Sequence, residues 1–137
     1  MTTRDRFVLD TNTIISAVLL PASLPRQAFD RAFDSGLVIA SEATVAELAD
    51  VLQRPRFDKY VREEARLHFF ATFIRATTLI AVTETITDCR DTKDNKFLEV
   101  AVSGHATVII TGDRDLLDLH PYRGIAIITP RDFMNRS

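Results

Sequence analysis

Short apolar runs rich in β-branched residues alternate along the chain with longer segments of helical periodicity, and this alternation constrains the fold more than any other feature. The runs are predicted to be strands at residues 6–9, 37–40, 78–82, 107–110 and 125–128. Helices are predicted at residues 13–20, 24–35, 42–53, 61–76 and 94–104. The runs show little apolar–polar alternation, as expected of strands that are covered on both faces. The pattern therefore predicts an α/β fold with a parallel sheet.

Length and composition predict one ordered domain. The 137 residues suit a single domain, and 46% hydrophobic with 26% charged residues allows a normal core and excludes global disorder. No repeat, low-complexity tract or linker interrupts the sequence. We therefore expect a single domain over residues 1–137.

Charge and cysteine content restrict the partners and the compartment. The net charge of −2 gives no overall attraction to nucleic acid or to an anionic membrane, so a nucleic-acid site must be a local patch. Cys89 is the single cysteine and cannot form an internal disulfide, which fits the cytoplasm. The N-terminal MTTRDRFVLD has no long apolar segment, so we expect neither a signal peptide nor a membrane span.

Acidic side chains follow two of the predicted strands. Asp10 comes directly after the first strand, and Asp113 and Asp115 come just after the fourth, in TGDRDLLDL. Ligands of open parallel sheets bind beyond the carboxyl ends of the strands. We therefore expect these carboxylates near one another at a functional edge of the sheet.

Two further acids lie on predicted helices. In the helix at 42–53, Glu47 lies about 40° from Val51, at the edge of the apolar stripe, and is the carboxylate best placed to face the same edge. Asp94 continues the face formed by Phe97 and Ala101 toward the start of its helix.

Each acid also has an interpretation without chemistry. Asp10 or Asn12 can cap the helix that follows, and Asp91 or Asp94 can cap the helix at 94–104, Asp91 being the better candidate for capping alone. The remaining acids can be solvated helix residues or turn residues. As a group, however, clustered carboxylates repel one another, and a divalent cation removes that penalty. Oxygen ligands suit Mg²⁺ or Mn²⁺, whereas Cys and His spacing for zinc is absent.

At these residues the sequence resembles the PIN domain family of metal-dependent ribonucleases, most of all its bacterial branch of toxins from toxin–antitoxin pairs. The matching segments run from about residue 6 to 134 in the family's order: FVLDTNTIISA, SEATVAELADVLQRPRF, DTKDNKFLEVAVSGHATVIITGDRDLL and GIAIITPRDFM. The first and third are specific together, and the second alone is weak. The resemblance implies a three-layer α/β/α fold with a parallel five-stranded sheet in the order 3-2-1-4-5.

The resemblance also implies the site. The family's catalytic, metal-binding acids fall on Asp10, Glu47, Asp94 and Asp113. Supporting residues fall on Asn12, Thr111 and Asp115, and Asp91 remains an alternative to Asp94 as the third ligand. The implied cofactor is one or two Mg²⁺ or Mn²⁺ ions, and the implied reaction is hydrolysis of phosphodiester bonds in single-stranded RNA. The implied partners are a cognate antitoxin protein and a second copy of the chain, with no membrane.

An acidic site needs nearby cations to guide phosphates toward it. The candidates for RNA contact are Arg54, Arg56, Lys59, Lys93 and Arg114, with Arg62, Arg66 and Lys96 as further cations of the same segments. A solvated helix face explains the run at 54–66 equally well, because three acids dilute it. Phe57 and Tyr60 are expected in the core rather than stacked on unpaired bases.

Two other functions remain open. A haloacid-dehalogenase-like phosphatase also has an acid after its first strand and a late motif such as Gly112-Asp113, but it needs a second acid where this chain has Asn12. A non-catalytic RNA-binding or protein-binding module of the same fold is expected to have lost one or more acids, and all four are present here.

Overall fold

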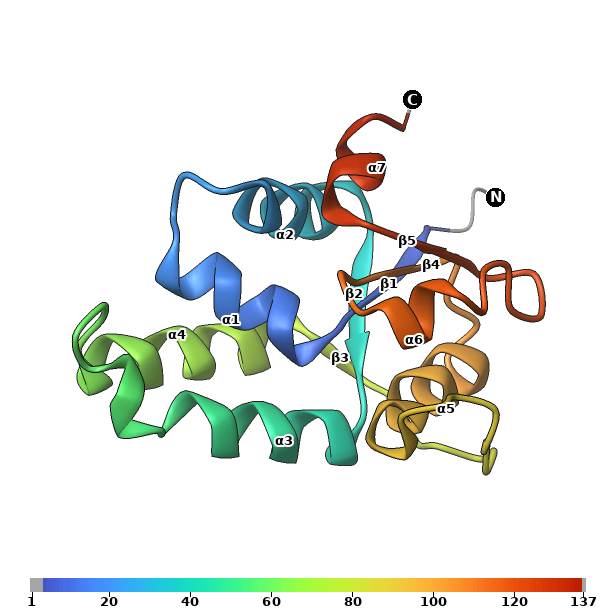
Figure 1. The fold of residues 1–137 in the computed structure, drawn as a ribbon, viewed down its shortest axis with the longest axis horizontal. Helices are drawn as coiled ribbons and strands as arrows, with labels where there is room; N and C mark the ends of the chain where they lie inside the picture. Colours follow the sequence, from blue (N-terminus) through green and yellow to red (C-terminus); the bar gives the residue numbers. More distant parts are fainter. Residues whose placement is uncertain (1–3, 137) are drawn as a thin grey trace.

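A parallel five-stranded sheet forms the centre of the protein, which the computed structural model describes over residues 4–136 (Figure 1). The strands are β1 (Arg6–Leu9), β2 (Leu37–Ala40), β3 (Thr78–Leu79), β4 (Val108–Ile110) and β5 (Ala126–Ile128). They lie in the order β3-β2-β1-β4-β5, and every neighbouring pair is parallel. The predicted fold class and strand order are therefore confirmed. The third strand is shorter than predicted: β3 covers Thr78–Leu79 at the edge of the sheet, where it pairs with β2.

Seven α-helices and two short 3₁₀ helices are present in the described residues. The longer helices are α1 (Thr11–Leu19), α2 (Leu24–Ser35), α3 (Glu42–Leu52), α4 (Glu63–Ala76) and α5 (Asn95–Ser103), each within two residues of its predicted bounds. The short ones are η1 (Pro55–Phe57), η2 (Thr92–Asp94), α6 (Arg114–Leu117) and α7 (Pro130–Met134). Within residues 4–136, none of these helices has the length and apolar character needed to cross a bilayer.

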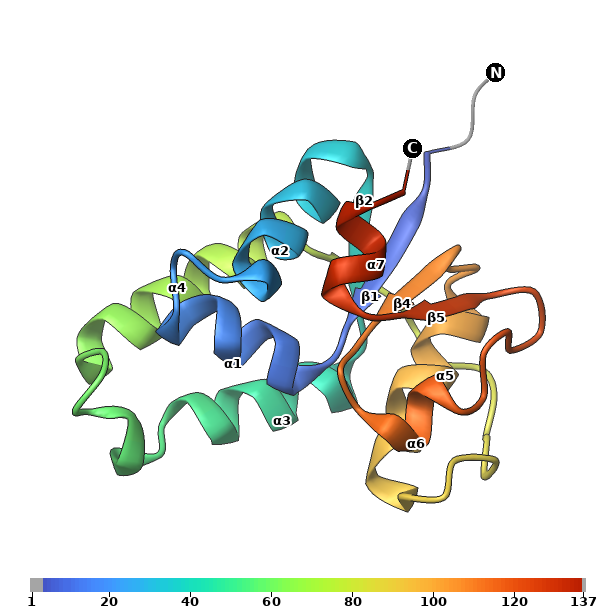
Figure 2. The same cartoon turned by 45° about the horizontal axis from the view of Figure 1, so that its top comes forward.

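The two faces of the sheet bury two separate cores. Along β1, Phe7 and Leu9 point into one core and Val8 into the other, as the alternation of a strand requires. Helices α1, α2, α3, α4 and α7 cover the first face, and α5 and α6 cover the second (Figures 1 and 2). The structure therefore has the three layers that the sequence predicts.

Capping side chains start helices immediately after the strands. Asp10 Oδ1 accepts a hydrogen bond from the backbone N–H of Thr13 at 2.9 Å and so begins α1 directly after β1. Ser41 begins α3 after β2 through a reciprocal capping box with Thr44. Asp113 begins α6 after β4 by accepting from the backbone N–H of Asp115 at 2.8 Å. These short connections place polar side chains at the carboxyl edge of the sheet.

One cation proposed for RNA contact is instead part of the core. Arg66 is fully buried, and its guanidinium donates to the carbonyl oxygen of Leu52 at 2.8 Å and to that of Val61. It also forms an ion pair with Asp58 at 3.0 Å. The prediction of RNA contact for Arg66 is therefore wrong, because its side chain joins the end of α3 to the turn before α4.

The two aromatic residues of this turn differ. Phe57 is buried, as predicted, and packs in the core of the first face. Tyr60 is 61% exposed, so the expectation of a core position is wrong for that residue.

Candidate metal centre

All four proposed ligands line one cavity. Asp10, Glu47, Asp94 and Asp113 border a volume of about 210 Å³ at the carboxyl ends of β1 and β4. Asp10 directly follows β1, and Asp113 comes three residues after the end of β4. Glu47 lies on α3, and Asp94 ends the 3₁₀ helix η2. The fold thus brings together side chains that are up to 103 positions apart in the sequence.

Asp10 is the most buried of these carboxylates, with 3% of its surface exposed. One of its oxygens caps α1, and the other accepts a hydrogen bond from the hydroxyl of Thr111. Burial raises the pKa of Asp10, and the hydrogen bonds from Thr111 and Thr13 oppose that rise without cancelling it. Asp10 therefore both caps α1 and lines the acidic cavity.

Among the neighbouring acids, Asp113 acts most strongly on Asp94. Burial, followed by the charge of Asp113 and contact with its carboxylate, raises the pKa of Asp94 from 3.8 to about 7. Asp94 Oδ2 is buried, with no hydrogen-bond partner among the described residues. Two like charges at close range repel, so near neutral pH Asp94 holds a proton or the two carboxylates need a cation.

Glu47 lies in the same cavity but already has two partners. The hydroxyl of Thr11 donates to its Oε2, and Lys96 forms an ion pair with its Oε1 at 2.8 Å. The Lys96 and Glu47 side chains are 22% and 27% exposed, so the pair lies at the mouth of the cavity. Glu47 is thus held by α1 and α5 at the same time.

The proposed supporting residues lie in different places. Thr111 is fully buried, and its oxygen accepts from the backbone N–H of Asp113 at 2.9 Å while its hydroxyl reaches Asp10. Asn12 and Asp91 line the cavity, and Asp91 also caps η2 by accepting from the backbone N–H of Lys93 at 3.1 Å. Asp115 does not line the cavity and instead pairs with Arg90 at 3.5 Å.

The proposed RNA-binding cations divide into two groups. Arg54 and Lys93 line the acidic cavity, and Arg54 is also paired with Asp50 at 3.2 Å. Arg56 and Lys59 lie farther along, over the rings of Phe57 and Tyr60 at 4.8 and 5.2 Å. Arg114 is exposed at the start of α6 and does not line the cavity.

The donor set fits a hard divalent cation, although the carboxylates do not form a closed ligand shell. Among residues 4–136 no three acidic, histidine or cysteine side chains are arranged to hold an ion as they stand. Asp94 and Asp113 nevertheless provide oxygen ligands, and the raised pKa of Asp94 marks a charge that is not compensated. Glu47 would have to exchange Lys96 for the ion. The oxygen ligands thus fit Mg²⁺ or Mn²⁺. Asp10, Asp94 and Asp113 could bind the ion without first giving up an ion pair, unlike Glu47.

Sequence reasoning missed the roles of Thr11 and Lys96. In the sequence, Thr11 is one of several small polar residues after Asp10, and Lys96 is one of several candidate cations for RNA. One signal was available: Lys96 follows Asp94 by two residues at the start of a helix, so both can face the same edge. Its pairing with Glu47 depends on the packing of α5 against α3, which the sequence does not reveal.

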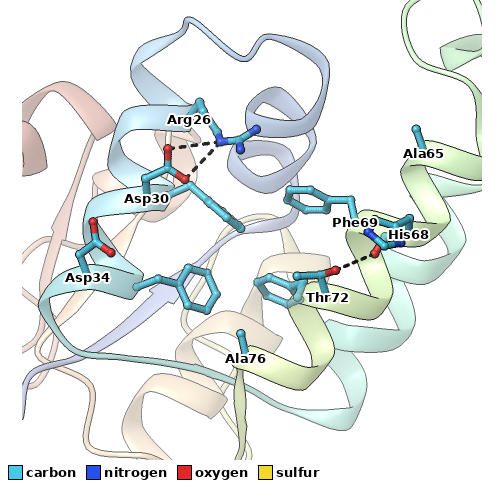
Figure 3. Close-up of a pocket in the computed structure, with 11 residues that line it drawn as sticks. Arg26, Asp30, Asp34, Ala65, His68, Phe69, Thr72 and Ala76 are labelled. Atoms are coloured by element: carbon cyan, nitrogen blue, oxygen red, sulfur yellow. Dashed lines mark hydrogen bonds and ion pairs between the residues drawn. The ribbon is translucent and has the colours of Figure 1, made fainter.

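A larger cavity of about 750 Å³ lies away from the acids, between α2 and α4 (Figure 3). Phenylalanine rings from both helices line it, and Arg26 and Asp30 pair at its rim at 3.2 Å. None of the proposed metal ligands borders it. The volume of a cavity alone therefore does not identify the candidate centre of this protein.

Comparisons with known proteins identify the family. A family model described as PIN domain matches residues 6–115. An uncharacterised protein of Methanocaldococcus jannaschii, MJ1680, is 34% identical over 116 residues, which cover 83% of this chain and 74% of that protein.

Two solved structures share the fold. VapBC2 from Rickettsia felis, crystallised with a DNA fragment from its promoter, superposes with a TM-score of 0.62 over 90% of this chain and 98% of that chain, at 12% identity. PAE2754 from Pyrobaculum aerophilum gives a TM-score of 0.62 over 96% of this chain and 88% of that chain, at 14% identity. At such identities the likeness concerns the fold alone. Because the family model spans most of the sequence, this chain belongs to the PIN domain family.

Proposed function

We propose that this protein is a Mg²⁺- or Mn²⁺-dependent endoribonuclease that hydrolyses single-stranded RNA in the cytoplasm, as one nuclease domain over residues 1–137. The observation that carries the proposal is the pairing of Asp94 with Asp113 in a cavity that Asp10 and Glu47 also line. Without a cation, repulsion between the two carboxylates lowers the stability of the folded protein. A protein that did not need this pair would be more stable with an amide at either position.

In this proposal Asp10, Glu47, Asp94 and Asp113 are the metal ligands and the catalytic acids. When bound, the divalent ion supplies Lewis acidity, which makes water a better nucleophile and neutralises charge on the phosphate. Thr111 fixes the carboxylate of Asp10 through its hydroxyl, and Thr11 fixes that of Glu47. Lys96, once released from Glu47, is proposed to bind a phosphate oxygen beside the cavity.

The path of the RNA is supported by cations beside the cavity. Arg54 and Lys93 border it, so both are proposed to contact the phosphates next to the cleaved bond. Arg56, Lys59 and Arg114 are proposed to contact RNA farther away. Asn12 and Asp91, which line the cavity, are proposed to orient ligands or water, whereas Asp115 supports the start of α6.

We also propose that the protein is the toxin of a type II toxin–antitoxin pair. The support is family membership, together with a fold shared with VapBC2. The acidic cavity predicts an antitoxin that presents a basic side chain to it. A homodimer is proposed as well. Co-purification with the product of a neighbouring gene, and loss of RNA cleavage in that complex, would test the pairing.

The nuclease proposal is tested by cleavage of an end-labelled, mixed-sequence single-stranded RNA with Mn²⁺, with Mg²⁺ and with EDTA. Wild type should cleave only with an ion, and Asp10→Asn and Asp94→Asn should each lose at least about a hundredfold in rate. Glu42→Gln, an exposed acid on the same helix as Glu47, is the control and should match wild type. Asp91→Asn should retain most of the cleavage activity. If Asp91→Asn is inactive and Asp94→Asn is active, then Asp91 is the metal ligand and Asp94 is not.

The ion pair between Lys96 and Glu47 favours a second candidate function. A non-catalytic RNA-binding or protein-binding module would keep Glu47 neutralised in this way permanently. That function predicts RNA binding without cleavage and no binding of Mn²⁺ measurable by calorimetry. A phosphatase would instead hydrolyse a small phosphomonoester, and an assay of this activity can use the same purified protein.

A further inference from the structure

A second opening lies directly beside the acidic cavity. This recess has a volume of about 600 Å³, which falls in the range of small-molecule sites. It is bordered by Leu24, Pro25, Gly112, Thr129, Pro130 and Arg131, which come from the start of α2, the turn after β4 and the start of α7.

The recess adjoins the acidic cavity. Asn12 and Asp113 border both, so a molecule with a phosphate at the acids would reach the recess past these two side chains. The cavity of about 210 Å³ is small for a nucleotide, whereas the recess has nearly three times that volume. The two together offer room for a phosphate and for the nucleoside attached to it.

The lining of the recess combines an apolar surface with polar groups at its edge. Leu24, Pro25 and Pro130 supply flat apolar surface against which a base or ribose can pack. The amide of Asn12 and the guanidinium of Arg131 are exposed, and neither makes a side-chain hydrogen bond or ion pair with another residue between 4 and 136. An amide can read the edge of a base, and a guanidinium can bind a phosphate.

Gly112 keeps one side of the recess open. A Cβ atom built on Gly112 would meet no heavy atom within 4 Å, and the φ angle of this residue lies outside the left-handed region. A larger side chain is therefore compatible with the backbone there, and it would project into free space instead of the core. The backbone conformation does not require glycine at position 112, but the missing side chain leaves room for a ligand.

We propose that this recess binds the nucleoside next to the phosphate that the acids cleave, and so sets the sequence preference of cleavage. This inference rests on the proposed function, because it assumes an RNA whose phosphate lies at Asp10, Asp94 and Asp113. It adds a binding site made of Asn12 and Arg131 and of the apolar surface beside Gly112.

The test uses four RNAs that differ only in the nucleotides flanking one cleaved bond. Gly112→Leu fills the recess and Arg131→Ala removes its cation, while Ala81→Leu and Arg75→Ala are matched changes at exposed positions away from it. Cleavage is followed with Mn²⁺. Binding of a fluorescein-labelled copy is followed separately by anisotropy in EDTA at low salt.

The proposal predicts that both recess variants bind RNA about tenfold more weakly and lose the preference among the four RNAs, and that both controls match wild type. Binding and preference unchanged in Gly112→Leu and Arg131→Ala would overturn it, even with cleavage intact. If Gly112→Leu does not fold, Arg131→Ala decides alone. A wild type that never cleaves, but whose binding falls in both variants, would refute the nuclease and keep the recess as an RNA site.

Discussion

Asp94 shows at the scale of one residue how the proposed functional site opposes stability. Its pKa is raised from 3.8 to about 7, so the folded protein holds a proton that the unfolded chain releases. The unfolded state therefore binds fewer protons between these two values, and the free energy of unfolding falls as the pH rises through that range. Above about pH 7 the whole penalty is present.

We therefore expect Asp94→Asn to stabilise the metal-free protein at pH 8 and to leave it nearly unchanged at pH 4. Asp94 is partly solvated, so the gain is about 1 kcal/mol, or ~2–4 °C in Tm. Thermal unfolding in EDTA at both pH values measures it, with the exposed Asp34→Asn as the control. A variant less stable than wild type at pH 8 would mean that the carboxylate of Asp94 is not under strain.

Thr111 gives a second prediction at this scale. Its hydroxyl donates to the buried Asp10 and accepts from the backbone of Asp113, so Thr111→Val keeps the shape and removes both bonds. We expect Mn²⁺ affinity to fall at least about tenfold, with Thr111→Ser close to wild type. Isothermal calorimetry decides. Equal affinity in the valine variant would show that Asp10 needs no orientation by this hydroxyl.

Two residues show where the sequence misleads about a single side chain. For Asp10, capping and membership of an acidic site appeared from the sequence as alternatives, yet a carboxylate has two oxygens and the structure uses one for each. Arg66 appeared as a surface cation because its neighbours in sequence are charged, although it is fully buried. Burial of a long cation depends on carbonyl groups from another segment, which no local pattern reveals.

Arg66 also matters at the scale of elements, because it joins α3 to α4. Its guanidinium donates to the carbonyl oxygens of Leu52 and Val61, and also to that of Arg54 at 3.4 Å. Replacement by methionine fills similar space but leaves these carbonyl groups without a donor. We expect Arg66→Met to lower the free energy of unfolding by about 3 kcal/mol.

Urea denaturation of Arg66→Met and of Asp58→Asn measures this contribution. The Asp58 partner is more than half exposed, so its loss should cost less than about 1 kcal/mol. If the methionine variant stays within about 1 kcal/mol of wild type, the hydrogen bonds of Arg66 do not hold the turn. Cleavage by this variant at low temperature separates loss of stability from loss of the site.

Helices were predictable in proportion to their length, and strands from their apolar, β-branched composition. The strands and the five longer helices follow from apolar runs and from helical periodicity over two turns or more. The helices α6 and α7 have four and five residues, too few for a periodic signal. Their starts could have been recognised only from Asp113 and Thr129, whose side chains cap them.

At the scale of the whole molecule, the fold converts positions far apart in sequence into one acidic edge. The strand order β3-β2-β1-β4-β5 places β1 beside β4, and so places Asp10 near Asp113. Which acids gather there follows from the sequence pattern and the family. The state of Glu47 does not, since its pairing with Lys96 depends on the packing of whole helices.

Mn²⁺ that binds only the folded protein must stabilise it, so Tm should rise with Mn²⁺ concentration in wild type. Asp10→Asn should show no such rise, whereas Glu42→Gln should match wild type. Calorimetric scans at several Mn²⁺ concentrations test this, and an equal rise in Asp10→Asn would place the ion elsewhere.

The most direct test of the central claim combines two quantities in one Mn²⁺ titration of wild type. Electron paramagnetic resonance gives the amount of bound Mn²⁺, and the rate of cleavage of an end-labelled single-stranded RNA is measured at each concentration. The account predicts that the rate rises in step with the bound ion, and that both are lost in Asp10→Asn. Cleavage that persists in EDTA, or full binding of Mn²⁺ without cleavage, would contradict it.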